Sequence, residues 1–469
     1  MNTHLIPVEI KQLINAETAF KYRIIPFCSE KDTIKFKTDN LKNDSLANEL
    51  EILLDKKIIL EFEESIIIDK LIAVNYRTQT KNDSVSAIGY SDDFLEKIVV
   101  TAKEIGSSDI HFEAFENKGR IRYRLDGKLK EQFYLTTEEY PIIVNKIKIK
   151  AQLDISEKRL PQDGRITITT EVDDFDIRVS ILPTLHGEKV VLRILSKDTS
   201  HINIDSLGFT AEELTIYLES IKKPNGIVLI SGPTGSGKTT TLYATLKLLN
   251  QTSTNILTVE DPIEYTLEGI NQVQLKESIG LDFATTLRTF LRQDPDVIMV
   301  GEIRDVNTAN MAVRAALTGH LVLSTIHTNS AWATISRLID MGIPPFLIAG
   351  TLNCSVAQRL VRKLCPVCKK EEAIDTSIFP TGFTLPKNMV KHFVSRGCNH
   401  CFHTGYLGRK AIYEILPIKK ELVGHINKNN TSIDFYLEEN KIRTLKKNAI
   451  QMIINGETSV DEVFSLLMI

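Results

Sequence analysis

Long apolar runs and a dominant charge are both missing from this 469-residue sequence. No apolar run approaches the roughly 18 residues that a membrane-spanning helix needs, and the N-terminal sequence MNTHLIPVEI lacks the charged-then-apolar pattern of a signal peptide. We therefore expect any membrane association to be peripheral. The formal net charge of -3 gives no general reason to bind nucleic acid.

Cysteine is also scarce, which argues against a disulfide-rich secreted domain. The chain has 6 cysteines, and four of them form two CxxC pairs. In a cytosolic protein such pairs indicate metal or redox chemistry. Cys28 and Cys354 stand apart and are interpreted as ordinary thiols.

The remaining composition is that of a soluble globular protein, with 42% hydrophobic and 25% charged residues. A chain of this length favours about two to four domains. GRIRYRLDGKL and GRITITTEVDDFDIRVSILPT alternate apolar and polar residues, which predicts half-buried strands, and LDG and QDG are typical turn sequences between them. We therefore expect a β-rich domain in this part of the chain.

A different pattern follows this β-rich part. Thr210 and Glu213 predict a capping box that opens a helix. From Gly226 onward, the apolar segments GIVLIS, NILTVE, DVIMVG and HLVLST alternate with helical stretches. This alternation predicts an α/β domain with a mostly parallel sheet flanked by helices.

A phosphate-binding loop joins the first of these strands to a helix. GPTGSGKT matches GxxxxGK[ST] at every fixed position, and the helix-forming TTTLYATLKLL overlaps its end. Glycines let backbone N–H groups surround phosphate oxygens, and the helix N-terminus adds partial positive charge. Lys238 is expected to reach the β and γ phosphates, and Thr239 to ligate Mg²⁺. The expected nucleotide-binding residues are Gly232, Pro233, Thr234, Gly235, Ser236, Gly237, Lys238, Thr239 and Thr240.

The ends of neighbouring strands supply the candidate catalytic residues. Ligands of parallel α/β sheets sit beyond the carboxyl ends of the strands. Glu302 follows DVIMVG at that end, whereas Asp296 begins the strand, about 20 Å back at roughly 3.3 Å per residue. We therefore predict that Glu302 orients and deprotonates the attacking water. Glu260 is a candidate for the Mg²⁺ shell or its water, and His327 for positioning the γ-phosphate.

Together these motifs resemble those of the secretion and pilus assembly ATPases, with the type II secretion ATPase as the nearest member. TVEDPIEY (Thr258 to Tyr265) resembles the aspartate box of that family, and DPDVIMVGEIRD (Asp294 to Asp305) its Walker B segment. TGHLVLSTIHTNSA, from Thr318, resembles its histidine box. The resemblance extends from about Ser107 to the C-terminus.

The resemblance implies a RecA-like phosphate-loop motor domain preceded by a β-rich α+β domain, in a hexameric ring. It also implies that ATP sits between the two domains and that arginines of the smaller domain approach the phosphates. LPQDGRI and FDIRVSILPTLHGEKVVLRIL supply Arg165, Arg178 and Arg193 as the candidates. The planar guanidinium suits this role because it binds phosphate oxygens bidentately. The weaker candidates are Arg122, Arg124 and Arg304.

The two CxxC pairs predict a structural zinc site. Four thiolates complete a tetrahedral shell around Zn²⁺ and leave no open position. A redox role fits poorly, because no βαβ pattern surrounds either pair. The resemblance agrees, since secretion and pilus-extension ATPases carry such an insertion and retraction ATPases generally lack it. The predicted ligands are Cys365, Cys368, Cys398 and Cys401.

Motifs and linker composition predict the organisation of the chain. The expected divisions are 1–77, an N-terminal adapter or docking domain; 78–93, a polar linker; 94–200, the β-rich subdomain; 201–358, the motor domain; 359–415, the cysteine module; and 416–469, a C-terminal helical region.

The most specific functional interpretation is an ATP-hydrolysing motor that assembles pseudopilus subunits for type II secretion. Type IV pilus extension and DNA-uptake pseudopilus assembly are alternatives within the same class. The resemblance implies a cytoplasmic protein docked on an inner-membrane platform through partner subunits. A RecA-like nucleic-acid motor is disfavoured by the acidic charge balance and the lack of a basic-aromatic groove pattern. A non-hydrolysing nucleotide-binding scaffold is disfavoured by Lys238, Thr239, Glu302 and His327.

Overall fold

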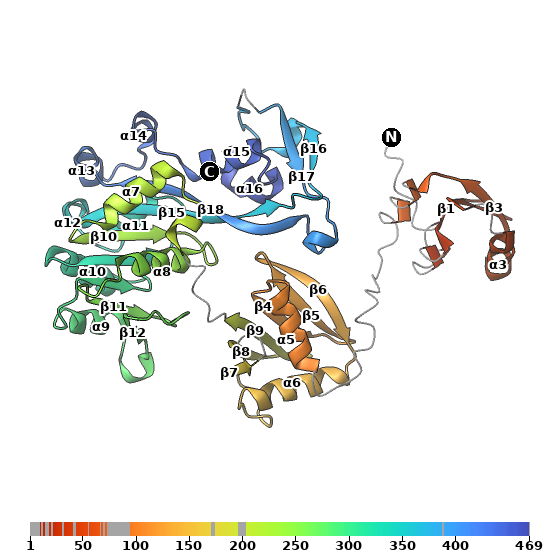
Figure 1. Cartoon of the computed structure of the whole chain (residues 1–469), viewed down its shortest axis with the longest axis horizontal. Helices are drawn as coiled ribbons and strands as arrows, with labels where there is room; N and C mark the ends of the chain where they lie inside the picture. Colours follow the sequence, from red (N-terminus) through yellow and green to blue (C-terminus); the bar gives the residue numbers. More distant parts are fainter. Residues whose placement is uncertain are drawn as a thin grey trace. The chain divides into compact units, whose positions relative to one another are not determined.

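The chain folds into two compact units, Met1–Phe94 and Leu95–Ile469. The computed structural model describes residues 10, 13–14, 18–19, 22–30, 32–40, 44–54, 56–65, 67–68, 71–72, 94–169, 174–195, 203–386 and 389–468. The predicted linker at 78–93 lies outside these residues. Figure 1 labels the elements along the chain.

The first unit contains a three-stranded sheet in the order β1-β2-β3. β1 (Ile24–Ser29) pairs antiparallel with β2 (Thr33–Thr38), and β2 pairs parallel with β3 (Lys57–Phe62). A parallel pair needs a crossover connection, and α3 (Asp44–Leu54) provides it. Isoleucine and leucine side chains of the sheet and helix form a separate small core.

The β-rich domain opens the second unit. It contains α5 (Phe94–Glu104), β4 (Asp109–Ala114), β5 (Gly119–Leu125), β6 (Lys128–Leu135), α6 (Glu139–Lys150), β7 (Gln162–Thr169), β8 (Asp174–Thr184) and β9 (Gly187–Leu195). The strands form an antiparallel sheet in the order β6-β5-β4-β9-β8-β7. Every second residue of β5 is buried, as the alternating pattern predicted.

One predicted turn of this domain is wrong. LDG does form the turn between β5 and β6, with positive φ angles at Asp126 and Gly127. QDG, by contrast, lies inside β7, paired with residues of β8. Gly164 serves close packing there, because a Cβ atom at this position would lie 3.0 Å from the carbonyl oxygen of Ala151.

The motor domain is built on a seven-stranded sheet in the order β12-β11-β13-β14-β10-β15-β18. The strands are β10 (Gly226–Ser231), β11 (Ile256–Glu260), β12 (Asn271–Gln274), β13 (Val297–Val300), β14 (Leu321–Ile326), β15 (Leu352–Leu364) and β18 (Tyr406–Pro417). All neighbouring pairs are parallel except β15 and β18. β10, β13 and β14 are buried throughout, which explains their continuous apolar sequences.

Helices cover both faces of this sheet (Figure 1). Ile227 and Leu229 of β10 join the core formed with α9, α10, α11 and the C-terminal helices, whereas Val228 and Ile230 join the core formed with α7 and α8. The predicted capping box of Thr210 is present at the start of α7. The helices are α7 (Ala211–Ile221), α8 (Lys238–Leu249), α9 (Phe283–Phe290), α10 (Val306–Leu317), α11 (Ala333–Asp340) and α12 (Pro345–Thr351), followed near the C-terminus by α13 (Lys420–Asn427), α14 (Asp434–Glu439), α15 (Leu445–Ile454) and α16 (Val460–Leu467).

The cysteine module is an insertion between two strands of the motor sheet. β15 and β18 pair along most of their length, and the predicted boundaries after residues 358 and 415 fall inside these strands. The inserted segment contains a two-stranded sheet of β16 (Lys370–Ala373) and β17 (Lys391–Val394). Among the described parts of the chain, no helix has both the length and the apolarity of a membrane span.

Candidate active site and metal centre

The phosphate loop lies between the end of β10 and the start of α8, as predicted. Gly237 caps α8 with a φ of 87°, a conformation that favours glycine. A Cβ atom at Gly232 would lie 2.5 Å from the carbonyl oxygen of Gln358, so only glycine fits there. The buried hydroxyl of Ser236 has no hydrogen-bond partner among the described residues. The loop therefore offers a free hydroxyl beside the N-terminus of a helix, which fits a phosphate group.

Lys238 is the first residue of α8, and its side chain turns back into this loop. Its Nζ atom donates to the carbonyl oxygens of Gly232, at 2.9 Å, and Pro233, at 3.1 Å. Burial lowers the pKa of Lys238, and the charge of Glu302 opposes this shift. Thr239 and Thr240 are exposed in the first turn of α8. Lys238 is thus held where it can exchange carbonyl partners for phosphate oxygens.

Glu302 and His327 come together at the carboxyl edge of the sheet. Nε2 of His327 lies 3.7 Å from Oε2 of Glu302, although the two residues follow different strands. Arg304 approaches the other carboxylate oxygen, with Nη2 at 2.5 Å from Oε1. Asp296, at the opposite end of β13, accepts the backbone N–H of Asn255. The side chain of Glu302 is 14% exposed, its two carboxylate oxygens are flanked by Arg304 and His327, and its charge acts on Lys238 of the loop.

Glu260 is held differently from Glu302. Its side chain is buried at the end of β11 and accepts hydrogen bonds from Thr258, at 2.6 Å, from Gln272, at 3.0 Å, and from the hydroxyl of Tyr243. These donors fix the carboxylate beside the loop that follows β11. Its role in the Mg²⁺ shell stays a prediction.

The three candidate arginines form a row across neighbouring strands. Arg165 of β7 pairs with Arg178 of β8, and Arg178 pairs with Arg193 of β9. Like charges on adjacent strands repel, and carboxylates compensate them here. Arg165 pairs with Asp176, and Nε of Arg193 lies 3.0 Å from Asp109.

Arg178 extends from this row to the motor domain. Its Nη1 atom donates to Glu264 Oε2 at 3.0 Å, and its Nη2 atom donates to the carbonyl oxygen of Ile263. Both acceptors belong to the segment that resembles the aspartate box. Arg178 thus connects the β-rich domain to the segment that follows β11 in the motor domain.

The four predicted cysteines form one cluster. Their Sγ atoms all lie within 4.8 Å of one another. The distances are 3.9 Å for Cys365 and Cys398, and 3.8 Å for both Cys368–Cys401 and Cys398–Cys401. A tetrahedron of thiolates about 2.3 Å from Zn²⁺ has edges of about 3.8 Å, which these separations match. The backbone N–H groups of Cys398 and Gly405 donate to Cys401 Sγ at 3.2 Å, as expected around a metal-bound thiolate.

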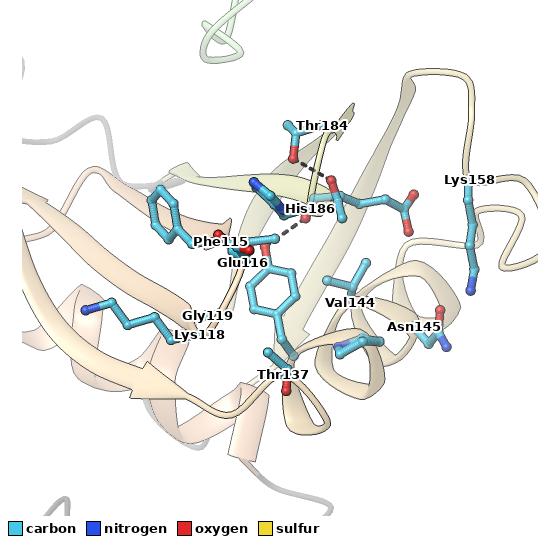
Figure 2. Close-up of a pocket in the computed structure, with 15 residues that line it drawn as sticks. Phe115, Glu116, Lys118, Gly119, Thr137, Val144, Asn145, Lys158, Thr184 and His186 are labelled. Carbon is cyan, nitrogen blue, oxygen red and sulfur yellow. Dashed lines mark hydrogen bonds between the residues drawn. The ribbon is translucent and has the colours of Figure 1, made fainter.

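A cavity of about 380 Å³ opens elsewhere, in the β-rich domain (Figure 2). Its lining comes from α6, the turn between β4 and β5, and the turn between β8 and β9. Inside it, the hydroxyl of Tyr140 donates to the carbonyl oxygen of Glu188 at 2.7 Å. None of its lining residues belongs to the phosphate loop, so this cavity is separate from the candidate nucleotide site.

One residue at the loop was not found from the sequence. Arg359 of β15 approaches Gly232, with Nη1 at 3.2 Å from the position of a Cβ atom there. The only signal for Arg359 is the register of β15 against β10, which the sequence does not reveal.

Comparison with known proteins identifies the family. The family model described as "Type II/IV secretion system protein" matches residues 87–465. Because this match covers most of the chain, the protein belongs to that family. The resemblance inferred from the four motifs is therefore confirmed.

Curated relatives include both pilus and secretion proteins. The type IV pilus assembly ATPase PilB of Myxococcus xanthus is 47% identical over 379 residues, which cover 78% of this chain and 66% of that protein. Type II secretion system protein E of Pseudomonas aeruginosa is 45% identical over 373 residues, covering 79% of this chain and 74% of that protein. The chain thus spans just under two thirds of the length of the PilB relative.

Solved structures confirm the predicted α/β fold class. The ATPase DotB of Legionella pneumophila aligns with a TM-score of 0.60 at 21% identity, covering 81% of this chain and 97% of that chain. The pilus retraction motor PilT with bound ADP aligns with a TM-score of 0.53 at 26% identity, covering 79% of this chain and 95% of that chain.

Proposed function

We propose that this protein hydrolyses ATP and drives the assembly of pseudopilus subunits for type II secretion. The observation that carries the proposal is the meeting of Glu302 and His327, 3.7 Å apart, at the sheet edge that also holds the phosphate loop. Family membership supports it, since the relatives include proteins named as assembly ATPases. Type IV pilus extension is the second candidate, because a PilB protein matches as well as a secretion protein does.

The proposed chemistry divides among a few side chains. Lys238 and the N–H groups of the loop bind the phosphates, and Thr239 holds Mg²⁺, which neutralises phosphate charge when bound. Glu302 accepts a proton from the water that attacks the γ-phosphate, and His327 positions that phosphate. The products are ADP and inorganic phosphate. Arg304 keeps Glu302 oriented by its ion pair.

A turnover assay tests the proposed activity. The purified chain with Mg²⁺ should release inorganic phosphate from ATP, and Lys238→Ala should remove both this release and most nucleotide binding, because Lys238 contacts the phosphates. Lys363→Ala is the matched control, since it removes an exposed lysine from β15. Failure of the unmodified protein to bind ATP would rule out the proposal.

Assembly and attachment belong to the same proposal. We infer a homo-hexameric ring docked on an inner-membrane platform through partner subunits. Residues 1–77 form the proposed docking region, because they carry none of the catalytic motifs. In such a ring the arginines of one chain can reach the nucleotide of its neighbour.

The cysteine cluster is proposed to bind zinc as a structural site. The support is the spacing of the sulfur atoms of Cys365, Cys368, Cys398 and Cys401, which suits a tetrahedral ion. Four thiolates fill the coordination shell of Zn²⁺ and leave no position open for substrate. Bound metal would tie the two ends of the inserted segment together beside β15 and β18. The site is therefore expected to stabilise the insertion rather than take part in ATP hydrolysis.

Metal analysis and a serine substitution test the zinc proposal. Freshly purified reduced protein should contain about one zinc per chain, and Cys398→Ser should lose most of it because only three thiolates remain. Heat should unfold this variant at a lower temperature, while ATP binding should change little. Cys28→Ser, the same substitution outside the cluster, should keep its zinc. Wild-type protein without zinc would contradict the assignment.

A further inference from the structure

β15 continues past the end of β10 and runs alongside the phosphate loop. The last paired residues are Ser231 of β10 and Ala357 of β15. On the edge that faces β10, the next residues of β15 therefore lie beside the loop, while their other edge stays paired with β18. Gln358 and Leu360 face one side, where both approach Gly237 and Gln358 accepts the hydroxyl of Thr241 at 3.0 Å. Arg359 points to the opposite side, as alternation along a strand requires.

The guanidinium of Arg359 lies between two loops of the candidate active site. On one side it approaches Gly232, and its Nη1 atom donates to the carbonyl oxygen of Gln358 at 3.0 Å. On the other side, Nη2 lies 3.4 Å from the carbonyl oxygen of Asn329 and 3.3 Å from its side-chain oxygen. Asn329 follows His327 by two residues, so one side chain lies beside Gly232 of the phosphate loop and contacts the histidine loop.

Arg359 has no anionic partner among the residues that the structure describes. No carboxylate there lies within 4.0 Å of it, and its hydrogen-bond acceptors are neutral. Burial lowers the pKa of Arg359, which the more distant charge of Glu414 opposes. Glu414 is itself engaged, because it accepts the N–H groups of Ala331 at 2.7 Å and Leu445 at 3.2 Å.

A second cation lies close to this unpaired guanidinium. Arg359 approaches Gly232, and the Nζ atom of Lys238 donates to the carbonyl oxygen of the same residue, at 2.9 Å. The charge of Arg359 accordingly contributes to lowering the pKa of Lys238. Glu302, the acid whose charge acts on Lys238, is already paired with Arg304. Two partly buried cations without a shared anion repel, and an anion placed between them would relieve that repulsion.

We propose that Arg359 binds the terminal phosphate of ATP within its own chain and couples that phosphate to the histidine loop through Asn329. This inference rests on the proposed nucleotide site. Arg359 differs from Arg178 because it belongs to the motor domain, on the strand that pairs with β10, which leads into the phosphate loop. It needs no domain movement to reach the nucleotide, so it contributes to binding as well as to hydrolysis.

Nucleotide titration of the full-length protein tests this proposal. Fluorescent analogues of ATP and ADP would be titrated against wild type, Arg359→Ala and Arg359→Lys in the presence of Mg²⁺. Loss of a charge-assisted contact should weaken ATP binding on the order of 10- to 100-fold in Arg359→Ala, with a smaller effect on ADP. Arg359→Lys should recover part of the affinity, because it restores the charge without the fork.

Two control variants separate phosphate binding from a purely structural role. Lys363→Ala removes an exposed positive charge from the same strand and should bind ATP normally. Asn329→Ala removes the side-chain acceptor of Arg359 and should keep most of the affinity while slowing turnover. If Arg359 only supports the loop, Arg359→Ala and Asn329→Ala should behave alike, with equal effects on ATP and ADP.

The outcomes distinguish this inference from the proposed function. Wild type that fails to bind ATP removes the proposed function itself. If wild type binds ATP and Arg359→Ala binds it equally well, the proposed role of Arg359 is wrong while the proposed function stands. Equal weakening of ATP and ADP contradicts the assignment to the terminal phosphate. Unfolding temperatures measured without nucleotide show whether Arg359→Ala is folded, and Arg359→Lys supplies the test if it is not.

Discussion

Glu302→Gln should bind ATP as the wild type does and hydrolyse it slower by on the order of 10²–10⁴-fold, the usual contribution of a general base. The amide has the size of the carboxylate but cannot accept a proton from the attacking water. Arg304 and His327 flank this carboxylate on separate oxygens, so the substitution changes chemistry with little change in shape. Phosphate release and nucleotide titration on the same preparation provide the measurement.

Glu268→Gln is the matched control for this prediction. It makes the same chemical change at an exposed residue between β11 and β12, and it should hydrolyse ATP at the wild-type rate. Turnover by Glu302→Gln at the wild-type rate would show that another group accepts the proton. Glu260 would then be the next residue to test, although its carboxylate already accepts three hydrogen bonds.

Short sequence motifs and the geometry of parallel sheets were sufficient to predict where part of the candidate site lies. The phosphate loop depends on a short sequence with a strand before it and a helix after it, and the structure places all three as expected. Glu302 and His327 were found because parallel strands end at one edge of a sheet, and the two residues do meet there. Such features need no knowledge of how distant segments pack.

Features that depend on distant packing could not be predicted. QDG has the composition of a turn, but Gly164 is glycine because the backbone at Ala151 packs against it. The cysteine spacing did not show that the module interrupts a sheet, since only the pairing of β15 with β18 reveals this. Arg359 was missed for the same reason, because its position follows from the register between β15 and β10.

The candidate arginines were partly predictable from the sequence and partly not. The resemblance selected Arg165, Arg178 and Arg193, but their arrangement as neighbours on three strands follows from the registers of the sheet. Each has a carboxylate partner, and the partner of Arg178 is Glu264, which lies 86 residues away in the sequence. Arg178 therefore contacts the motor domain through an acid, and binding a phosphate would require it to exchange this partner.

Arg178→Ala should bind ATP nearly normally and hydrolyse it more slowly by on the order of 10³–10⁵-fold, the range known for arginine fingers in phosphoryl transfer. The transition state spreads charge over three oxygens, and Lys238 with Mg²⁺ leaves part of that charge unneutralised. Arg165→Ala should show the same kind of loss if the row acts together. Steady-state phosphate release and ATP titration separate the effect on hydrolysis from the effect on binding.

Arg159→Ala is the control for these variants, because Arg159 lies in the same domain, is 90% exposed and pairs only weakly with Glu157, at 3.6 Å. It should hydrolyse ATP at the wild-type rate. Parental turnover by both Arg165→Ala and Arg178→Ala would exclude a mechanism in which the β-rich domain closes over the nucleotide.

Mixing two inactive variants decides whether the arginine acts across a subunit boundary. Arg178→Ala chains keep an intact phosphate loop, and Lys238→Ala chains keep an intact arginine. If Arg178 reaches the nucleotide of its neighbour, mixed rings should recover part of the activity, since some sites then combine the intact loop of one chain with the intact arginine of the next. Mixed rings that form without recovery would mean that Arg178 acts within its own chain, where it contacts Glu264, or that it is not an arginine finger.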